Sequence, residues 1–237
     1  MWPGNTPGPW GAEASVTKSL VENAISEPLR ESLSDDIGVA IMTNADEVLL
    51  RDPSGLRRSH QAPTTLRWVV SAENIRDWSA TVSQVVVSSY RSDGTLPTFS
   101  RIPRSTQAYL RGFRTLLENR KGFNNKTFKQ LGRPLHSFER FNARKLNDTS
   151  VLAIAEIATH NHCVELSTNW APERTALTIS MDGRAIVSTS LIVGTLNSST
   201  ALFWLKQVCF NKRASETPKQ TTILYTLVVR FRPCRCQ

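Results

Sequence analysis

The sequence has few cysteines and no long hydrophobic run. Four cysteines in 237 residues are too few for a scaffold held by disulfides. No run of 18 apolar residues is present that could cross a membrane. The first 13 residues contain three prolines and three glycines, and they lack the basic start and apolar centre of a secretory signal. These absences predict an intracellular location, in the cytoplasm or nucleus, or a place in a virion.

The sequence also lacks the short motifs of common enzymes. It contains no phosphate-binding P-loop, no G-x-G-x-x-G fingerprint and no G-x-S-x-G nucleophile turn. Signatures of RNA-recognition, KH and zinc-finger modules are missing as well. We therefore expect a protein without a catalytic role and without a cofactor, and no motif assigns the chain to a family.

What the sequence does have is a strongly localised positive charge. Residues 101–146 contain 12 Lys and Arg but only two Glu, a net charge of +10. The other 191 residues contain 17 basic and 18 acidic side chains. A charge concentrated in one segment is typical of a chain that binds a polyanion.

Hydrophobic periodicity predicts a mainly β (α+β) fold, an antiparallel sandwich or jelly-roll-like sheet. A helix is expected over residues 15–26, after a flexible Pro/Gly-rich arm at residues 1–14. Asp182-Gly183 favours a type I′ hairpin turn, which would place Ile179 opposite Ile186. The expected strands cover residues 39–42, 47–51, 66–71, 81–90, 151–159, 163–168, 175–181, 184–193, 201–210 and 221–231.

One amphipathic basic helix is expected between the two groups of strands, over residues 104–121. Its apolar side chains recur at helical spacing and form one stripe, made of Tyr109, Leu110, Phe113, Leu116 and Leu117. Residues 15–237 are thus expected to form a single mostly β domain, with a basic helical and loop insertion at about residues 101–146.

Thirteen residues of this insertion are candidates for binding nucleic acid. Cations neutralise phosphates and release counterions, and exposed aromatic rings give bases a surface for stacking. RNA is the favoured partner, DNA is the alternative, and self-association stays open. The candidates are Arg104, Arg111, Arg114, Arg120, Lys121, Phe123, Lys126, Phe128, Lys129, Arg133, Arg140, Arg144 and Lys145.

His160 and His162 are the candidate metal ligands, because alternate residues of a strand point to the same face. The His-Asn-His string partly resembles the His-hydrophobe-His element of rolling-circle replication nucleases. It departs from that element in its polar central Asn161 and in the lack of a following Tyr-x-x-Lys. Solvated histidines in a loop explain the string more simply, although Cys234 and Cys236 leave a joint metal site open.

The combined pattern predicts a non-enzymatic nucleic-acid-binding protein. A basic, strand-rich chain with many Ser and Thr residues has the composition of a small virus coat or movement protein, which needs only contacts to the nucleic-acid backbone. Two alternatives remain. One is a metal-dependent nuclease or replication-type endonuclease that uses His160 and His162, and the other is a protein-interaction module or host-factor antagonist.

Overall fold

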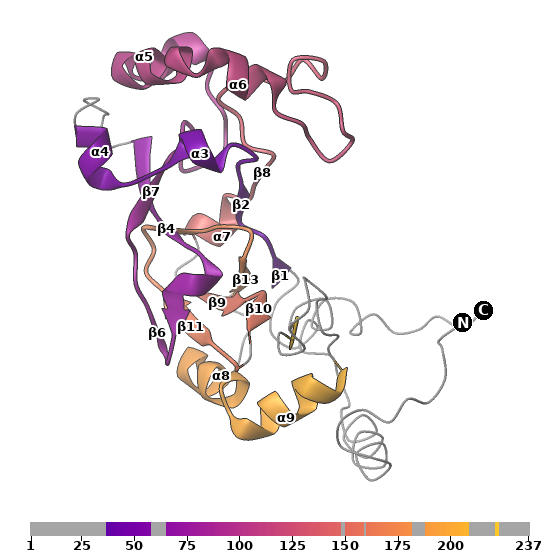
Figure 1. Ribbon diagram of the computed structural model, residues 1–237. Coiled ribbons are helices and arrows are strands. Elements are labelled where there is room, and N and C mark those ends of the chain that lie inside the picture. Colours follow the sequence, from indigo (N-terminus) through magenta and orange to yellow (C-terminus); the bar gives the residue numbers. More distant parts are fainter. Residues whose placement is uncertain are drawn as a thin grey trace, which may run out of the picture.

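The computed structural model describes residues 37–57, 65–147, 150–158, 160–181, 188–208 and 221–222. The described part is elongated, with helices α5 (Arg104–Gly112) and α6 (Arg114–Asn119) at one end. Helices α8 (Thr189–Leu196) and α9 (Ser199–Val208) lie at the other end, and the strands lie between (Figure 1). The arm at residues 1–14 and the helix expected over residues 15–26 fall outside the described residues.

The sheet nearer to α8 has four antiparallel strands in the order β1-β13-β9-β11. Every residue of the two central strands is buried, which fits their near-continuous apolar sequences. Ile192 of α8 and Leu205 of α9 belong to the same hydrophobic cluster as this sheet, so the two helices cover it. The strands are β1 (Ile37–Gly38), β9 (Val151–Ala155), β11 (Cys163–Leu166) and β13 (Ala176–Ser180).

The second four-stranded sheet has the order β12-β4-β7-β3 and lies nearer to α5 and α6. Its β12–β4 pair is parallel and the other two pairs are antiparallel. Leu110 of α5 and Leu117 of α6 are fully buried in one cluster with Val86 of this sheet. The strands are β3 (Leu50–Arg51), β4 (Leu66–Val70), β7 (Gln84–Val87) and β12 (Trp170–Pro172).

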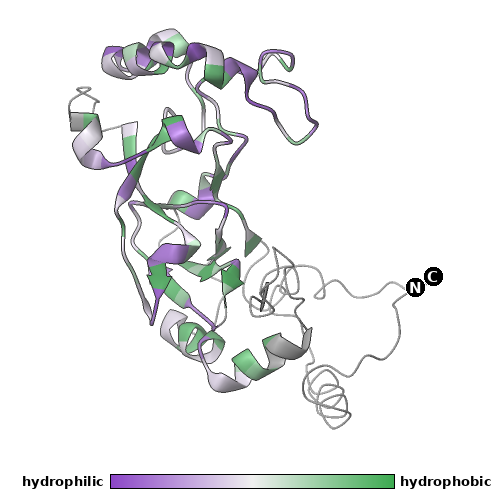
Figure 2. Cartoon of the chain, viewed as in Figure 1, coloured by the Kyte–Doolittle hydropathy of each residue, from purple (hydrophilic) through white to green (hydrophobic). Residues whose placement is uncertain are grey.

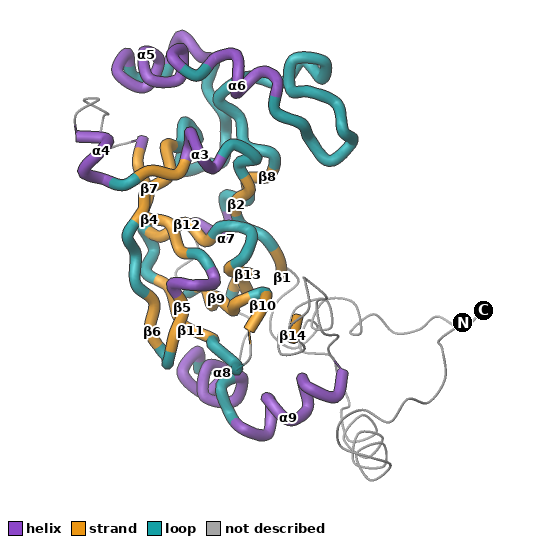
Figure 3. Tube along the Cα trace, viewed as in Figure 1, coloured by secondary structure: helices purple, strands orange, loops and turns teal. Residues whose placement is uncertain are grey.

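Short strand pairs and short helices complete the described part (Figure 3). The pairs are β2 (Ile41–Met42) with β8 (Arg140–Phe141), β5 (Ile75–Arg76) with β6 (Ser79–Ala80), and β10 (Ile157–Ala158) with β14 (Thr221–Thr222). The short helices are α3 (Asp46–Leu49), α4 (Pro53–Arg57), α7 (Arg144–Asn147), η2 (Ala72–Asn74) and η3 (Phe99–Arg101). None of the described helices is long and apolar enough to span a membrane.

The mainly β, α+β class is confirmed, because antiparallel pairs dominate and only a few helices are present. A sandwich or jelly-roll arrangement is not established and stays a prediction. The expected basic helix is also present, as the consecutive helices α5 and α6. They are separated at Phe113, whose φ of −111° and ψ of 17° depart from helical values.

Two expected strands are wrong over their described residues, and a third, expected over residues 47–51, forms a strand only at its end, as β3. Residues 189–193 belong to helix α8 and residues 201–208 to helix α9, while residues 46–49 form α3 rather than a strand. The hairpin expected after β13 is therefore also wrong, because the described residues of its second strand belong to helix α8. Its turn at Asp182-Gly183 lies outside the described residues. Strand β13 pairs instead with β1 and β9, which places Ile179 opposite Ile37 and Leu152.

Candidate nucleic-acid interface

Exposed cations are spread over the end of the molecule that contains α5, α6 and the segment 120–139. We call this part the basic end. In Figure 2 the segment after α6 is coloured mostly as hydrophilic, and Figure 1 shows it projecting from the body beside α6. Seven of the candidate cations, two of them just beyond this segment, are exposed and form no ion pair with a described residue: Arg104, Arg111, Lys121, Lys126, Lys129, Arg140 and Arg144.

Helix α5 places Arg104 and Arg111 two turns apart on one face. Seven residues of α-helix rise about 10.5 Å and turn almost twice, so both guanidinium groups can contact one strand of a nucleic-acid backbone. The opposite face is fixed by Tyr109, whose hydroxyl donates to the Val48 carbonyl over 2.6 Å. The same hydroxyl accepts a 2.7 Å bond from Nε of Arg51. The helix is therefore a rigid support for its two exposed cations.

Two further candidate arginines are held in ion pairs. Nε of Arg114 lies 2.6 Å from a carboxylate oxygen of Glu118, one turn later on α6. Nη1 of Arg133 lies 2.6 Å from Oε2 of Glu139, and its Nη2 also donates to the Phe138 carbonyl. Because part of their charge is already neutralised, these arginines contribute less to binding an anion than the seven cations above.

Three of the thirteen candidates are buried, which corrects their expected place on the surface. Phe128 is fully buried, so its ring cannot stack on a base. Arg120 is 7% exposed and donates to the carbonyls of Leu135 and Ser137. Burial and, second, the like charge of Arg133 lower the pKa of Arg120 to about 10, which leaves it a cation at neutral pH. Lys145 is 2% exposed, and its Nζ donates to the Thr178 carbonyl over 3.3 Å.

Phe123 remains the one aromatic candidate on the surface. Its side chain is 68% exposed, the highest value among the large hydrophobic residues of the described part. It lies in a tight loop after α6, and the guanidinium carbon of Arg140 lies 5.9 Å from its ring centre. An exposed ring next to a cation fits a surface that meets bases and phosphates together.

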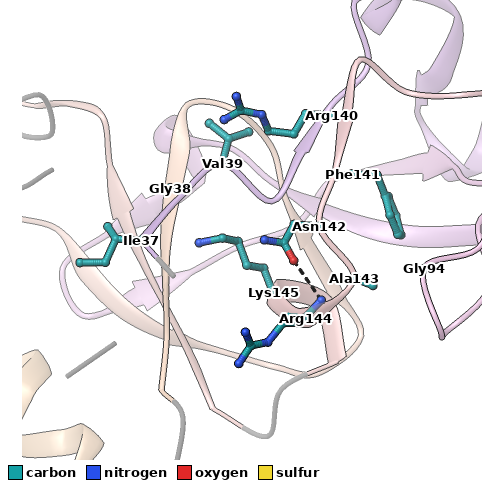
Figure 4. A pocket seen from close by; sticks show the side chains of 10 residues that line it. All are labelled: Ile37, Gly38, Val39, Gly94, Arg140, Phe141, Asn142, Ala143, Arg144 and Lys145. Carbon is teal, nitrogen blue, oxygen red and sulfur yellow. Dashed lines mark hydrogen bonds between the residues drawn. The ribbon is translucent and has the colours of Figure 1, made fainter. Parts of the chain in front are cut away.

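A hollow of about 450 Å³ lies where β1, β8 and α7 meet. Figure 4 shows that Arg140, Arg144 and Lys145 line it, with Asn142 accepting a 3.1 Å hydrogen bond from the Arg144 backbone N–H. None of the described residues that line the hollow is acidic. It therefore extends the positive charge of the basic end toward the centre of the molecule.

The two candidate metal ligands lie in the loop before β11, with ring centres 6.5 Å apart. Between them, Nδ2 of Asn161 donates to the Leu196 carbonyl over 2.7 Å and fastens the loop to the end of α8. Burial and the nearby positive charge of Arg76 lower the pKa of His162. The described residues contain no cluster of three His, Cys, Asp or Glu side chains that could hold a metal ion, and Cys234 and Cys236 lie outside them.

Sequence reasoning missed three exposed residues at the basic end. Arg101 is exposed in η3 directly before α5, and its signal was present in the charge count of the segment. Asn124 and Asn125 lie beside Phe123 and are also exposed. Asparagine carries no charge and no periodic pattern, so only the structure distinguishes these two from other surface amides.

Comparisons with known proteins show similarity to parts of longer enzymes, and no family model matches the chain. The chain is 29% identical over 191 residues to the adenine-specific methyltransferase PglX of Streptomyces coelicolor A3(2). This match covers 80% of the chain and 16% of PglX. The fold resembles part of the Type IIL restriction-modification enzyme MmeI, whose structure was solved in complex with DNA. That match has a TM-score of 0.54 at 12% identity, and covers 76% of the chain and 23% of MmeI.

These similarities correct two expectations. The chain spans about one sixth of PglX and less than a quarter of MmeI, and one protein is named as a methyltransferase and the other as a restriction-modification enzyme. The interpretation as a small virus coat or movement protein is therefore wrong. The expectation of a protein with no enzymatic role is wrong for the same reason, because both proteins that the chain resembles are named as enzymes.

Proposed function

We propose that this chain takes part in DNA modification and provides DNA-binding surface for that reaction. The single observation that carries the proposal is the series of exposed, unpaired cations at the basic end. The two similar proteins supply the context, because one is an adenine-specific methyltransferase and the other was solved with DNA bound. DNA thus replaces RNA as the proposed partner.

The mode of binding follows from the chemistry of the exposed side chains. Arginine and lysine heads neutralise phosphates irrespective of sequence, and they position a protein on a duplex. Arg104 and Arg111 would lie along one backbone, while the lysines of the segment 120–139 would contact phosphates farther along. Because α5 and α6 bury Leu110 and Leu117 against the body, these cations are presented on a fixed support. A fixed support lowers the entropic cost of binding.

Two parts of the earlier expectation stand as proposals beside this one. The first is the division of residues 15–237 into a single mostly β domain with the basic insertion. The second is the choice of contact residues, now reduced to the exposed members of the original set. The antagonist alternative gains no support, since neither similar protein is named as one. A nuclease that uses His160 and His162 gains none either, because the two histidines have no third ligand among the described residues.

The experiment is a binding titration with a fluorescently labelled duplex of random sequence. The double variant Arg104→Gln/Arg111→Gln is compared with the wild-type 237-residue chain and with Arg76→Gln as a control. Arg76 is exposed but lies in β5, near the other end of the molecule (Figure 3). We expect the double variant to bind every duplex more weakly, by about tenfold or more at low salt, and the control to bind like wild type.

Circular dichroism and thermal unfolding show whether each variant is folded. A folded double variant with unchanged affinity would refute the proposed surface. A control variant weakened as much as the double variant would show that the overall charge, rather than the basic end, controls the interaction.

A further inference from the structure

The loop that follows Lys121 has a rigid tip. The backbone N–H of Gly122 donates to the Lys126 carbonyl over 3.0 Å, and that of Asn125 donates to the Gly122 carbonyl over 3.0 Å. Asn125 has a φ of +61°, a left-handed conformation that asparagine tolerates better than most residues. These bonds close the loop into a narrow turn whose shape does not depend on a ligand.

The base of the same loop is fixed to the body of the protein. Nδ2 of Asn44 donates to the Lys121 carbonyl over 3.1 Å, and the Phe123 N–H donates to Oε1 of Glu139 over 3.3 Å. Glu139 also lies close above Gly122, where an added Cβ would come within 3.1 Å of Oε2. The tip is therefore held in a defined position relative to α5 and α6.

The tip presents one apolar ring and one complete amide to solvent. Phe123 is mostly exposed, and the carboxamide of Asn125 makes no hydrogen bond within the part of the chain that the structure describes. Asn124 differs, because its Oδ1 accepts a 3.2 Å bond from the Lys126 backbone N–H. Of the two neighbouring asparagines, Asn125 thus keeps both its acceptor and its donors available for a partner.

This pair of groups matches the edge of one kind of base pair. In the major groove, adenine offers the N6 amino donor and the N7 acceptor, which an asparagine amide binds in a bidentate manner. The thymine of the same pair offers its C5 methyl group, which makes apolar contacts. A two-stranded turn is narrow enough for the major groove, which is about 12 Å wide. Lys121, Lys126 and Arg140 beside the tip supply cations for the flanking phosphates.

We propose that the loop tip enters the major groove and recognises an A·T base pair, with Asn125 bonded to adenine and Phe123 against the thymine methyl. The inference rests on the proposed function and adds sequence recognition to it. The cations position the chain on the duplex, and the tip makes the binding depend on the base sequence.

The first test is selection of bound sequences from a random duplex pool by the wild-type chain, Asn125→Ala and Phe123→Ala. Asn119→Ala and Phe203→Ala are the matched controls, because both residues are exposed and lie outside the tip. We expect the wild type and the controls to enrich a site with a fixed A·T pair. Both tip variants should bind DNA but lose the preference at that pair.

The second test changes single atoms of the selected pair. Replacing adenine by 7-deazaadenine removes the N7 acceptor, and replacing thymine by uracil removes the methyl group. We expect 7-deazaadenine to weaken the wild type about tenfold and Asn125→Ala hardly at all. Uracil should weaken the wild type but leave Phe123→Ala unaffected.

The outcomes separate this inference from the proposed function. A wild-type chain that binds duplexes without sequence preference, or tip variants that keep the wild-type preference, would overturn recognition by the loop and leave DNA binding intact. Equal effects of both base analogues on the wild type and the tip variants would also overturn it, and would assign recognition to another part. A wild-type chain that binds no duplex at all would overturn both proposals.

Discussion

The guanidinium carbon of Arg120 lies 3.9 Å from the centre of the buried Phe128 ring. Arg133 lies over the same ring at 4.2 Å, so two cations share one aromatic partner in the interior of the basic end. Arg120 also donates to two backbone carbonyls of the segment that returns from the loop. This arrangement holds the segment 120–139 in shape, and it assigns Phe128 a role in stability rather than in contact with bases.

Phe128→Ala is therefore expected to destabilise the protein by about 3–5 kcal/mol, because it removes a fully buried ring and leaves a cavity. Phe123→Ala serves as the control and should change the free energy of unfolding by less than about 0.5 kcal/mol, since that ring is exposed. Urea unfolding measures both. A stable Phe128→Ala protein with weakened DNA binding would return Phe128 to the interface.

A comparison of Lys145 with Lys126 tests whether burial prevents a lysine from contributing to DNA binding. Lys145 is buried and bonded to the Thr178 carbonyl, whereas Lys126 is exposed at the loop. Lys126→Met should weaken DNA binding and reduce its dependence on salt. Lys145→Met should change neither, provided that the variant remains folded in circular dichroism. The opposite ranking of the two variants would show that Lys145 reaches the DNA.

His136 is expected to make the protein less stable in mild acid. Burial lowers its pKa below the usual 6.5, and its Nε2 bonds the Pro97 carbonyl over 2.9 Å. The unfolded state then binds more protons than the folded state, so the His136 contribution to stability is lost as the pH falls below about 6.5.

The contribution of His136 is measured as the difference between the wild type and His136→Gln in urea unfolding from pH 7.5 to about pH 5. The difference is needed because Glu173 acts in the opposite direction: burial raises its pKa, which favours the folded state as the pH falls. The stability of the wild type should decrease more steeply with acid than that of the variant. Parallel curves would contradict the assignment.

Asn197 and the two loop histidines should differ sharply in their effect on stability. The Asn197 side chain makes two hydrogen bonds with the backbone of buried Cys163, at 2.7 and 2.8 Å. Asn197→Ala is expected to cost about 2 kcal/mol or more, because it leaves buried polar groups unpaired. His160→Ala and His162→Ala should each cost less than about 1 kcal/mol.

Thermal unfolding measures these variants, and elemental analysis of the purified wild type checks the metal hypothesis. Stoichiometric zinc or manganese that is lost on substitution of either histidine would contradict the structural role assigned to this loop.

The sequence predicts those strands and helices in which the spacing of the apolar residues matches the residues that are buried in the structure. Strands β4, β9, β11 and β13 lie within their predicted ranges because runs rich in Val, Ile and Leu become buried strands. Helices α5 and α6 follow from an apolar stripe at helical spacing. Helices α8 and α9 are missed because their β-branched and Ser-rich sequences favour strands locally. In the structure, Ile192 and Leu205 pack on the first sheet, and this packing stabilises the helices. Ser188 was a usable signal, since its hydroxyl caps α8 by accepting from the Leu191 N–H over 3.3 Å.

Of the candidate interface, only the position of the charged segment can be predicted from the sequence. The count of basic residues selects a segment for the interface, but nothing in the local sequence distinguishes buried Arg120 from exposed Arg111. That difference arises from carbonyl partners 15 and 17 residues away along the chain. The sequence does not decide between RNA and DNA as the partner, because phosphate-binding chemistry is common to both and composition carries no trace of the longer proteins that the chain resembles.

The measurement that tests the central claim most directly is the salt dependence of binding between the 237-residue chain and a random-sequence duplex. If about six of the seven exposed cations neutralise phosphates, the logarithm of the affinity should fall against the logarithm of the salt concentration with a slope of roughly −5. In the Arg104→Gln/Arg111→Gln variant the slope should become shallower by about one to two units. A wild-type slope near zero, or a variant slope equal to that of the wild type, would contradict a DNA-binding surface at the basic end.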